Sequence, residues 1–202
     1  VKLPDIRRGE YEGFETKISD PEWSPDYGPS VFNPKMGVTA SGARNILIAY
    51  NVNLDTDDKS AANRIAGKIR SSGVLMKDEN GEKIIGDDGK PLRIAGQFEA
   101  LQAAGWMYNE DIAQVSMNLL DYSKSGLHSV TEAIRNEAAS MGLTVTAGEL
   151  VGLVPLTALL DAGEFYNTDS DIDDSRQLVD YAISGLQLDV LDSFDPVERV
   201  IE

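Results

Sequence analysis

The sequence contains no cysteine, and this absence removes several kinds of chemistry at once. Disulfide bonds, thiolate metal sites and thiol nucleophiles are all excluded. Histidine is almost as scarce, since His128 is the only one in 202 residues. A Ser-His-Asp set, a phosphate loop and a multi-histidine metal site are absent as well, and the acidic run at Asp169 to Asp174 lacks the spacing of a calcium loop. We therefore expect no metal.

Long apolar runs and an excess of basic residues are also missing. No stretch approaches the roughly 18 apolar residues that a membrane helix needs, and residues 1–13 contain no apolar targeting segment. Eighteen basic against 34 acidic residues give a net charge of −16, which repels both a phosphate backbone and an anionic membrane. We expect a soluble, cytoplasmic protein that binds neither nucleic acid nor membrane. Because no initiator Met is present, we expect the natural polypeptide to begin before Val1.

What the sequence does contain is an alternation of strand and helix patterns. Helix periodicity changes to strand alternation and back in the order β, α, β, β, α, β, which is the split βαβ order of a ferredoxin-like fold. The expected strands are Val38–Ala40, Asn45–Leu54, Phe98–Tyr108, Ile112–Leu120 and Leu143–Thr146. The expected helices are Pro4–Lys17, the segment from the caps Asp55, Thr56 and Asp57 to Gly73, Leu127–Met141, Pro155–Phe165 and Ser175–Ser184.

These elements predict an α+β fold, an α/β sandwich whose antiparallel or mixed sheet carries helices on one face, with extra helices at the C-terminal end. Residues 1–36 are expected to form a linker helix and a Pro-rich loop, and residues 37–202 the main body. Within that body, residues 76–92 contain the turn pairs Asn80-Gly81 and Asp88-Gly89 among charged residues. They are predicted to form an inserted, exposed ribbon.

Several sequence blocks carry a resemblance to a known family. The run PDYGPSVFNPKMGVTASGARNILIAYNVNL spans Pro25 to Leu54. It is accompanied, in order, by LPDIRRGEYEG at Leu3 to Gly13, AQVSMNLLDYSKSGLHSV at Ala113 to Val130, LVGLVPLTALLDAGEFY at Leu150 to Tyr166 and FDPVERVIE at Phe194 to Glu202. This ordered set closely resembles the glutamate formimidoyltransferase family, and more specifically the C-terminal half of its transferase domain.

The resemblance implies an enzyme of histidine breakdown and one-carbon metabolism. Such an enzyme transfers a formimidoyl group from N-formimidoylglutamate to N5 of the co-substrate tetrahydrofolate and releases glutamate, with folate lying between two similar halves. The family's catalytic histidine lies in the N-terminal half, before Val1, so this chain alone is expected to be inactive. His128 matches a non-catalytic family position and is expected to serve in packing or capping.

Two stretches match folate-contacting segments of the family. The first is the Pro-rich loop, where Lys35 can hold a folate carboxylate and Phe32 can pack on a ring, although a packed Phe32 and a solvated Lys35 are the alternative. In the second stretch, Gly96 to Gly105, small residues allow the strand backbone to approach a ligand. Glu99 and Ala100 in this stretch stand where relatives often carry basic residues. The predicted folate-binding residues are Gly28, Pro29, Ser30, Val31, Phe32, Asn33, Pro34, Lys35, Met36, Gly37, Gly96, Gln97, Phe98, Gln102, Ala103, Ala104 and Gly105.

Glu149 is the candidate catalytic residue, because it stands where family members carry Gln or Glu. A carboxylate there can pair with a cationic amidinium and orient it for attack, with Gly148 and Gly152 leaving space around it. A capping or structural role for Glu149 remains the alternative.

Three hypotheses about function stay open at this point. The chain is the folate-binding half of a formimidoyltransferase that works with an N-terminal half; or a non-catalytic folate-binding or assembly module; or part of a relative that transfers a formyl group. The missing half would leave an apolar patch exposed, so a dimer or larger homo-oligomer is expected. A cyclodeaminase domain after Glu202 is left open.

Overall fold

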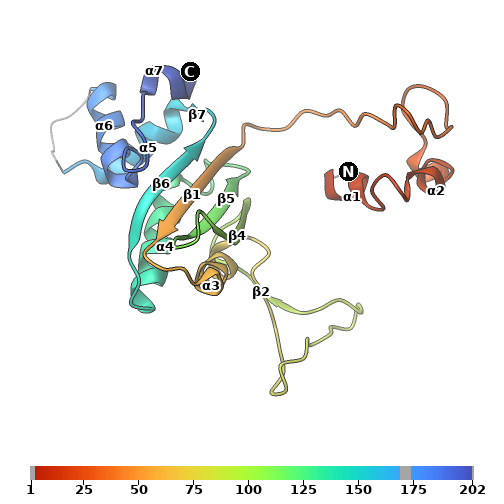
Figure 1. The fold of residues 1–202 in the computed structure, drawn as a ribbon, viewed down its shortest axis with the longest axis horizontal. Helices are drawn as coiled ribbons and strands as arrows, with labels where there is room; N and C mark the ends of the chain where they lie inside the picture. Colours follow the sequence, from red (N-terminus) through yellow and green to blue (C-terminus); the bar gives the residue numbers. More distant parts are fainter. Residues whose placement is uncertain (1–2, 169–173, 202) are drawn as a thin grey trace. The chain divides into compact units, whose positions relative to one another are not determined.

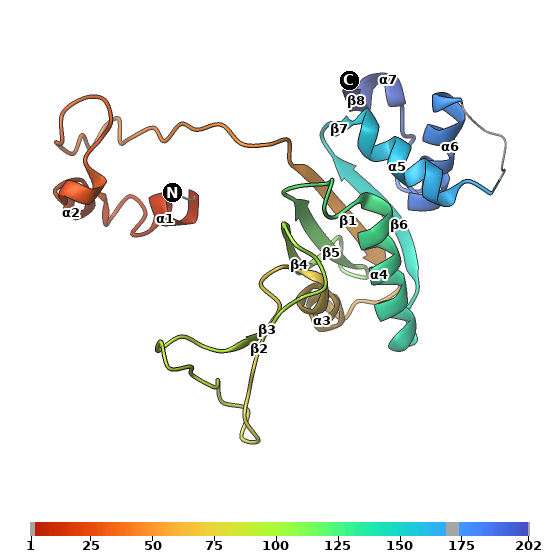
Figure 2. The same ribbon diagram turned by 180° about the vertical axis from the view of Figure 1, so that it is seen from behind.

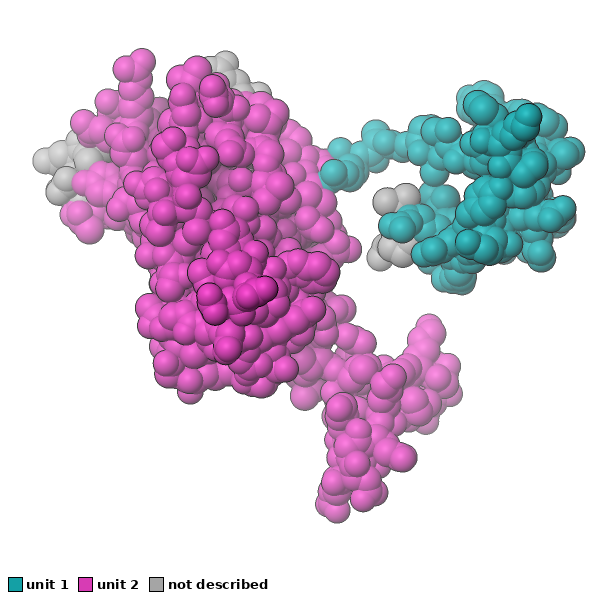
Figure 3. All heavy atoms as spheres, viewed as in Figure 1, with its two compact units in different colours: residues 1–44 teal, residues 45–202 magenta. Residues whose placement is uncertain are grey.

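The computed structural model describes residues 3–168 and 174–201, which form two compact units (Figure 3). Unit 1 comprises residues 1–44 and unit 2 comprises residues 45–202. The division falls between Arg44 and Asn45, whereas the sequence places it between Met36 and Gly37.

Unit 1 contains three short helices, α1 (Leu3–Arg7), α2 (Phe14–Ile18) and the 3-10 helix η1 (Pro21–Trp23). The continuous helix predicted for Pro4–Lys17 is wrong, because Gly9 (φ 86°) and Glu10 (φ 49°) adopt the left-handed conformation, which a right-handed helix cannot contain. The two pieces are tied together by Lys17. Its Nζ donates to the backbone oxygens of Asp5 at 2.7 Å and Ile6 at 2.6 Å, in the last turn of this short helix.

The rest of unit 1 is irregular, and the strand predicted at Val38–Ala40 is not formed. Residues 33–37 instead make a tight turn, in which Asn33 Oδ1 accepts the backbone N–H groups of Lys35 and Met36. The Phe32 ring packs on Tyr11, with ring centroids 5.5 Å apart, and on Phe14 at 6.0 Å. This aromatic cluster joins the Pro-rich loop to the helical part of unit 1.

Unit 2 is built on a four-stranded antiparallel sheet with the strand order β4-β5-β1-β6 (Figure 1). The strands are β1 (Ile48–Leu54), β4 (Leu101–Met107), β5 (Ala113–Leu119) and β6 (Val145–Val151). Helix α3 (Lys59–Ile69) follows β1, and α4 (Leu127–Ser140) follows β5. The predicted α+β fold and split βαβ order are thereby confirmed.

One face of this sheet carries the apolar core. Ile48, Tyr50, Val52 and Leu54 alternate along β1 and are fully buried in one cluster with apolar residues of both helices. The alternation follows from strand geometry, in which every second side chain points to the same side. Burial raises the pKa of Tyr50 to about 12, so its hydroxyl keeps its proton and bonds the Thr131 hydroxyl of α4 at 3.0 Å.

Helix α3 begins later than expected. Its N-cap is Asp58, whose Oδ1 accepts the Ser60 N–H at 2.8 Å. The expected cap Asp55 is engaged elsewhere, since its Oδ1 accepts the backbone N–H of Thr144, just before β6, at 2.6 Å. A long-range bond that joins the ends of two neighbouring strands therefore takes the place of the predicted local cap.

Residues 76–92 extend from the sheet as a narrow ribbon, visible at the lower edge of Figures 1 and 2. Its base is the antiparallel pair β2 (Val74–Leu75) and β3 (Arg93–Ile94). Gly81 (φ 82°) and Gly89 (φ 74°) take the left-handed conformation at its two turns. No side chain between Lys77 and Pro91 is buried.

The C-terminal part of unit 2 adds a helical layer at the β6 edge of the sheet. Helix α5 (Leu156–Tyr166) packs on α6 (Ser175–Leu186), and α7 (Pro196–Arg199) leads into β8 (Val200–Ile201), which pairs in parallel with β7 (Val154–Pro155). The last three elements are absent from the sequence prediction because they are only two to four residues long.

Polar contacts fasten this layer to α4. Arg135 Nη2 donates to the backbone oxygen of Gly185 at 2.6 Å, and its Nη1 pairs with Glu132. The Tyr166 hydroxyl donates to the same carboxylate at 2.9 Å. Burial and this bond hold the pKa of Tyr166 well above its usual range, so the phenol remains a donor.

Helices α5 and α6 approach each other closely at Gly163. A Cβ added at Gly163 would lie 2.0 Å from the backbone oxygen of Leu178. Gly163→Ala is expected to lower the free energy of unfolding by about 1–3 kcal/mol, because the two helices must move apart. Urea denaturation followed by circular dichroism measures the change. Glu164→Ala, at the next, exposed position of α5, is the matched control, and equal effects of the two substitutions would contradict the packing described.

Candidate functional site

The sheet face opposite the helices is polar, and it carries the candidate residue Glu149. Strand register places three rows of side chains across it. The rows are Gln102, Asn118, Ala49 and Val151; Ala104, Ser116, Asn51 and Glu149; and Trp106, Gln114, Asn53 and Ala147. The twelve positions that alternate with the apolar core therefore hold five amides, one serine and one carboxylate beside five apolar residues.

Amide groups from two other strands hold the Glu149 carboxylate. Asn51 Nδ2 on β1 donates to Glu149 Oε2 at 2.8 Å, and Gln114 Nε2 on β5 donates to the same oxygen at 2.9 Å. Gln114 Nε2 also donates to Asn53 Oδ1 at 2.9 Å. Gln114 and Asn53 are buried, with 4% and 1% of their surface exposed. Three strands thus converge on one carboxylate oxygen.

No positive charge balances this carboxylate within residues 3–168 and 174–201, where Glu149 takes part in no ion pair. Its second oxygen, Oε1, has no hydrogen-bond partner in the same ranges. A half-buried carboxylate held by neutral amides favours a cationic or strongly donating ligand group. The chemistry available at Glu149 is therefore binding and orientation of such a group.

A cavity of about 310 Å³ lies beside Glu149, between β6 and the segment that follows α6. Leu188, Leu191, Phe194 and Tyr108 provide apolar and aromatic walls, and Arg199 lies at its edge. Arg199 Nη1 is directed to the backbone oxygens of Leu150 and Gly152, at 3.5 Å each. Glu149, Asp192 and Ser193 also line the cavity, so its lining is more polar than apolar.

The expected roles of the two glycines beside Glu149 differ in the structure. Gly148 does not leave space for a ligand, because a Cβ there would lie 2.3 Å from the backbone oxygen of Leu186 and 2.9 Å from the Tyr50 hydroxyl. Its N–H donates to the Gln187 oxygen at 3.1 Å, so the glycine allows the C-terminal layer to approach β6. Gly152 (φ 84°) has open space around it.

The second predicted folate stretch is divided by strand geometry. Gln102 and Ala104 lie on the same sheet face as Glu149, whereas Ala103 and Gly105 face the helices. The Gly105 N–H donates to Asn63 Oδ1 of α3 at 2.9 Å. Successive strand residues point to opposite faces, so side chains of a continuous run cannot all reach one ligand.

The start of that stretch packs against the end of α3. The N–H groups of Gln97 and Phe98 donate to the oxygens of Lys68 and Ile69 at 2.9 and 3.0 Å. A Cβ at Gly96 would lie 1.9 Å from the Arg70 oxygen. Folate contact by these residues stays a prediction, although the backbone donors of Gln97 and Phe98 are already engaged.

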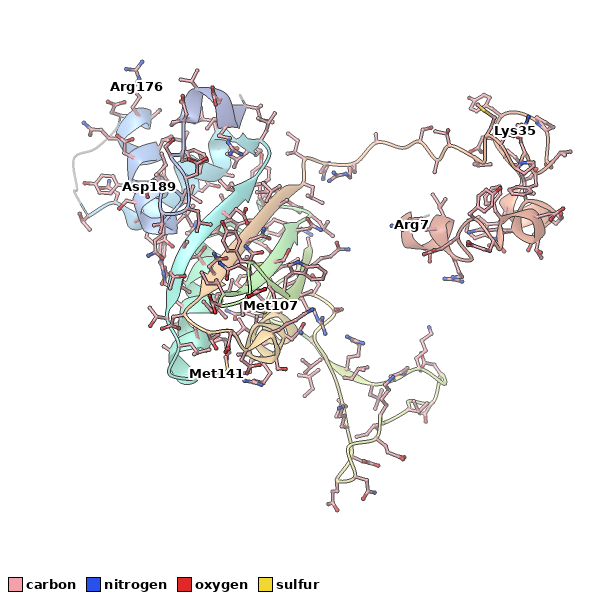
Figure 4. The ribbon with its side chains drawn as sticks, viewed as in Figure 1. Arg7, Lys35, Met107, Met141, Arg176 and Asp189 are labelled. Atoms are coloured by element: carbon pink, nitrogen blue, oxygen red, sulfur yellow. The ribbon has the colours of Figure 1, made fainter. Side chains whose placement is uncertain are left out.

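The first predicted folate stretch, Gly28 to Gly37, belongs to unit 1, and the second stretch and Glu149 belong to unit 2. Lys35 is exposed and forms no ion pair in the part of the chain that the structure describes (Figure 4). Phe32 is half-buried in the aromatic cluster of unit 1. Phe32 is therefore packed and Lys35 solvated, as in the alternative to ligand binding given above. Contact of either side chain with folate stays a prediction.

Comparison with known proteins identifies the family. Residues 49–202 match the Formiminotransferase domain, and residues 1–44 match the Formiminotransferase domain, N-terminal subdomain. The first match alone covers more than half of the chain. The chain belongs to the formiminotransferase domain family. The resemblance to the family is confirmed, whereas the narrower assignment to the C-terminal half of the domain stays a prediction.

Curated relatives agree with this assignment. Formimidoyltransferase-cyclodeaminase of Rattus norvegicus is 42% identical over 203 residues, which cover 99% of this chain and 34% of the relative. The protein of the same name from Dictyostelium discoideum is 39% identical over 204 residues, covering 100% of this chain and 35% of the relative. Glutamate formimidoyltransferase of Streptococcus pyogenes serotype M1 is 36% identical over 184 residues, covering 91% and 54%. The chain therefore spans about a third of the length of the two cyclodeaminase-containing relatives.

Sequence reasoning missed the residues that surround Glu149 in this formiminotransferase domain. Asn51 and Asn53 lie in the predicted strand Asn45–Leu54, and Gln114 lies in the block AQVSMNLLDYSKSGLHSV. The available signal was a polar side chain at alternate positions, Asn51 and Asn53 in one strand and Gln114, Ser116 and Asn118 in the other. Trp106, which is 60% exposed with Lys59 Nζ 4.7 Å from its ring centroid, lies on the same sheet face and is not among the predicted site residues.

Metal ligation and membrane spanning find no support among the residues described. No group of three or more His, Asp or Glu side chains could hold a metal ion there. Residues 169–173 of the acidic run lie outside the described residues, so the expectation of no metal stays a prediction. No helix in the described ranges is long and apolar enough to cross a membrane.

His128 lies at the start of α4 and packs on α5. Its ring stacks on Phe165 with centroids 4.8 Å apart, and it does not cap its helix. Burial holds the pKa of His128 below its usual range, against the opposing influence of Asp161 and Glu132. The packing role expected for this family position is confirmed.

The lowered pKa of His128 predicts a pH dependence of stability. Because the unfolded chain binds the proton more readily, this group's contribution is present above its ordinary pKa of about 6.5 and is lost as the pH falls toward the lower folded value. Unfolding free energies of the wild type and His128→Gln are compared from pH 7.5 to 5. The wild type is expected to lose more stability over this range, and a constant difference between the curves would contradict the assignment.

Proposed function

We propose that this chain takes part in formimidoyl transfer from N-formimidoyl-L-glutamate to tetrahydrofolate, a step of histidine degradation. The observation that carries the proposal is a half-buried Glu149 carboxylate without a cationic partner in the described residues, in a member of the formiminotransferase domain family. The relatives' names include formimidoyltransferase. Because the chain spans about a third of some of them, the complete activity is proposed for the protein to which the chain belongs.

In this proposal, Glu149 binds the amidinium of the donor. A carboxylate stabilises the positive charge of the amidinium and orients its carbon toward the attacking folate nitrogen. The new C–N bond gives a tetrahedral intermediate, which collapses as the bond to the glutamate nitrogen breaks. The cavity of about 310 Å³ beside Glu149 offers space for the donor next to the carboxylate.

The proton transfers of this reaction need a second group. A proton must leave the attacking nitrogen and another must reach the departing glutamate nitrogen, which is work for a general acid–base near neutral pH. His128 is unsuited, because its ring is stacked on Phe165 in the helical layer. We propose that the group is the histidine that the family resemblance places in the N-terminal half, and that this chain has no turnover without it.

Folate contact is proposed for Gly28 to Gly37 and for Gly96 to Gly105, with Lys35 holding a folate carboxylate. Two other functions remain open for the same face. The second candidate is a folate-binding or assembly module that carries out no chemistry. It is favoured because His128, the single histidine of the sequence, is stacked on Phe165 and not placed at Glu149. A formyl donor presents the same glutamate and folate groups and is the third. We propose a homo-oligomer in each case.

Calorimetric titrations with N-formimidoyl-L-glutamate and with folinic acid test the two proposed contacts separately. Glu149→Ala is expected to weaken binding of N-formimidoyl-L-glutamate by about 10-fold to 100-fold, because a hydrogen bond to a charged group contributes about 1.5–3 kcal/mol. Lys35→Ala is expected to weaken binding of folinic acid less, as an exposed charge contributes at most about 1 kcal/mol.

Glu164→Ala is the control, because Glu164 is an exposed carboxylate on α5 without a hydrogen-bond or ion-pair partner in the ranges described. Equal affinities of the wild type and Glu149→Ala for N-formimidoyl-L-glutamate would sink the assignment of Glu149. Binding without turnover, even after the N-terminal half is supplied, would favour the assembly module.

A further inference from the structure

The two amide donors at Glu149 converge on the same oxygen. Asn51 Nδ2 and Gln114 Nε2 both bind Oε2, at 2.8 and 2.9 Å. A carboxylate oxygen has two lone pairs, so two N–H donors satisfy Oε2 completely. The other oxygen, Oε1, is left for a group from outside the described chain.

The longer of these contacts requires an extended side chain. Asn51 is the direct cross-strand neighbour of Glu149, but Gln114 lies on β5 and reaches across β1 to β6. A buried side chain held in this way loses rotamer freedom, at a cost of roughly 1.5–2 kcal/mol. The contact therefore has to be supported by the residues around it.

Asn53 supports Gln114 in this orientation. Its Oδ1 accepts the Gln114 Nε2 group at 2.9 Å, and both side chains are buried. If the Gln114 amide were reversed, its carbonyl oxygen would face Asn53 Oδ1 and Glu149 Oε2, and three acceptors would meet.

The other end of the Asn53 amide also indicates that Asn53 serves to orient Gln114. Asn53 Nδ2 is buried and has no hydrogen-bond partner in the part of the chain that the structure describes. An unsatisfied buried donor costs about 1–3 kcal/mol. Rotating the Asn53 amide by about 180° would move its oxygen away from Gln114 and break their hydrogen bond. The observed orientation keeps this bond and leaves Asn53 Nδ2 without a partner among the described residues.

We propose that Asn51 and Gln114, with Asn53 behind them, are positioning residues that direct Glu149 so that only Oε1 meets the substrate. The inference rests on the proposed function and specifies its recognition step. The ligand group is bound through a single carboxylate oxygen, as by one amidinium N–H, and not by a two-pronged pair of parallel hydrogen bonds. Substrates that offer one cationic N–H at this point fit the site.

A purely structural role for the same amides is the competing explanation, and double-mutant cycles separate the two. In the complete enzyme, Gln114→Met and Asn51→Leu keep the side-chain size but remove the donors. Each is expected to lower kcat/KM for the formimidoyl donor by on the order of 10-fold to 100-fold, because the carboxylate is no longer aimed. In a Glu149→Ala background the same substitutions are expected to have no further effect on kcat/KM, since they act through Glu149.

Two further variants complete the kinetic test. Asn136→Leu, at an exposed position of α4, is the control for loss of an amide and is expected to match the wild type. Glu149→Gln retains an oxygen that can accept hydrogen bonds from both Asn51 and Gln114, so it is expected to keep wild-type stability. Its affinity for the formimidoyl substrate is expected to fall, because the negative charge is lost. Losses from Gln114→Met and Asn51→Leu that remain equally large in the Glu149→Ala background would overturn the proposal.

A readout without substrate distinguishes this proposal from the proposed function. In ¹H–¹⁵N spectra, the side-chain amide signals of Asn51 and Gln114 are expected to move in Glu149→Ala and to stay nearly unchanged in Glu164→Ala. If neither signal moves, the positioning role is wrong whatever the kinetics. If both signals move but the complete wild-type enzyme transfers no formimidoyl group, the proposed function is wrong. The positioning of Glu149 by Asn51 and Gln114 is then still supported.

Discussion

The two-residue period of strand β1 is the constraint on which both the core and the candidate site depend. Ile48, Tyr50, Val52 and Leu54 point to the helices and are fully buried, whereas Asn51 and Asn53 point to the opposite face. Because β1 lies between β5 and β6, each of its residues has a cross-strand neighbour on both sides. A shift of the register by one residue would place the amides in the core and the apolar residues at Glu149.

This constraint also explains how a polar network can persist inside a small domain. Buried amides are stabilising only when hydrogen-bond partners are provided, and here Asn53, Gln114 and Glu149 provide them for one another. The apolar face carries the stability of the sheet, so the polar face is free to serve binding. The unsatisfied Nδ2 of Asn53 is a local cost of the kind found at functional sites.

Most regular elements of unit 2 could be predicted from the sequence, because each is specified by periodicity within a short window. Helices α3 to α6 and strands β1, β4 and β5 lie where apolar spacing predicts them, while β6 extends five residues beyond the predicted end at Thr146. In unit 1 the same reasoning failed, since the apolar spacing of residues 4–17 continues through Gly9 and Glu10, whose left-handed backbone ends α1. The short β7–β8 pair depends on contacts between distant residues and has no local signal.

The sequence by itself determined the absence of thiol chemistry, the βαββαβ order and the family, because composition and ordered blocks need no knowledge of contacts. It also singled out Glu149, through the block that carries it. Only the tertiary structure decided what surrounds that carboxylate, since Asn51 and Gln114 lie 98 and 35 residues away along the chain. Strand order and register brought them together, and both are set by the packing of the sheet against its helices.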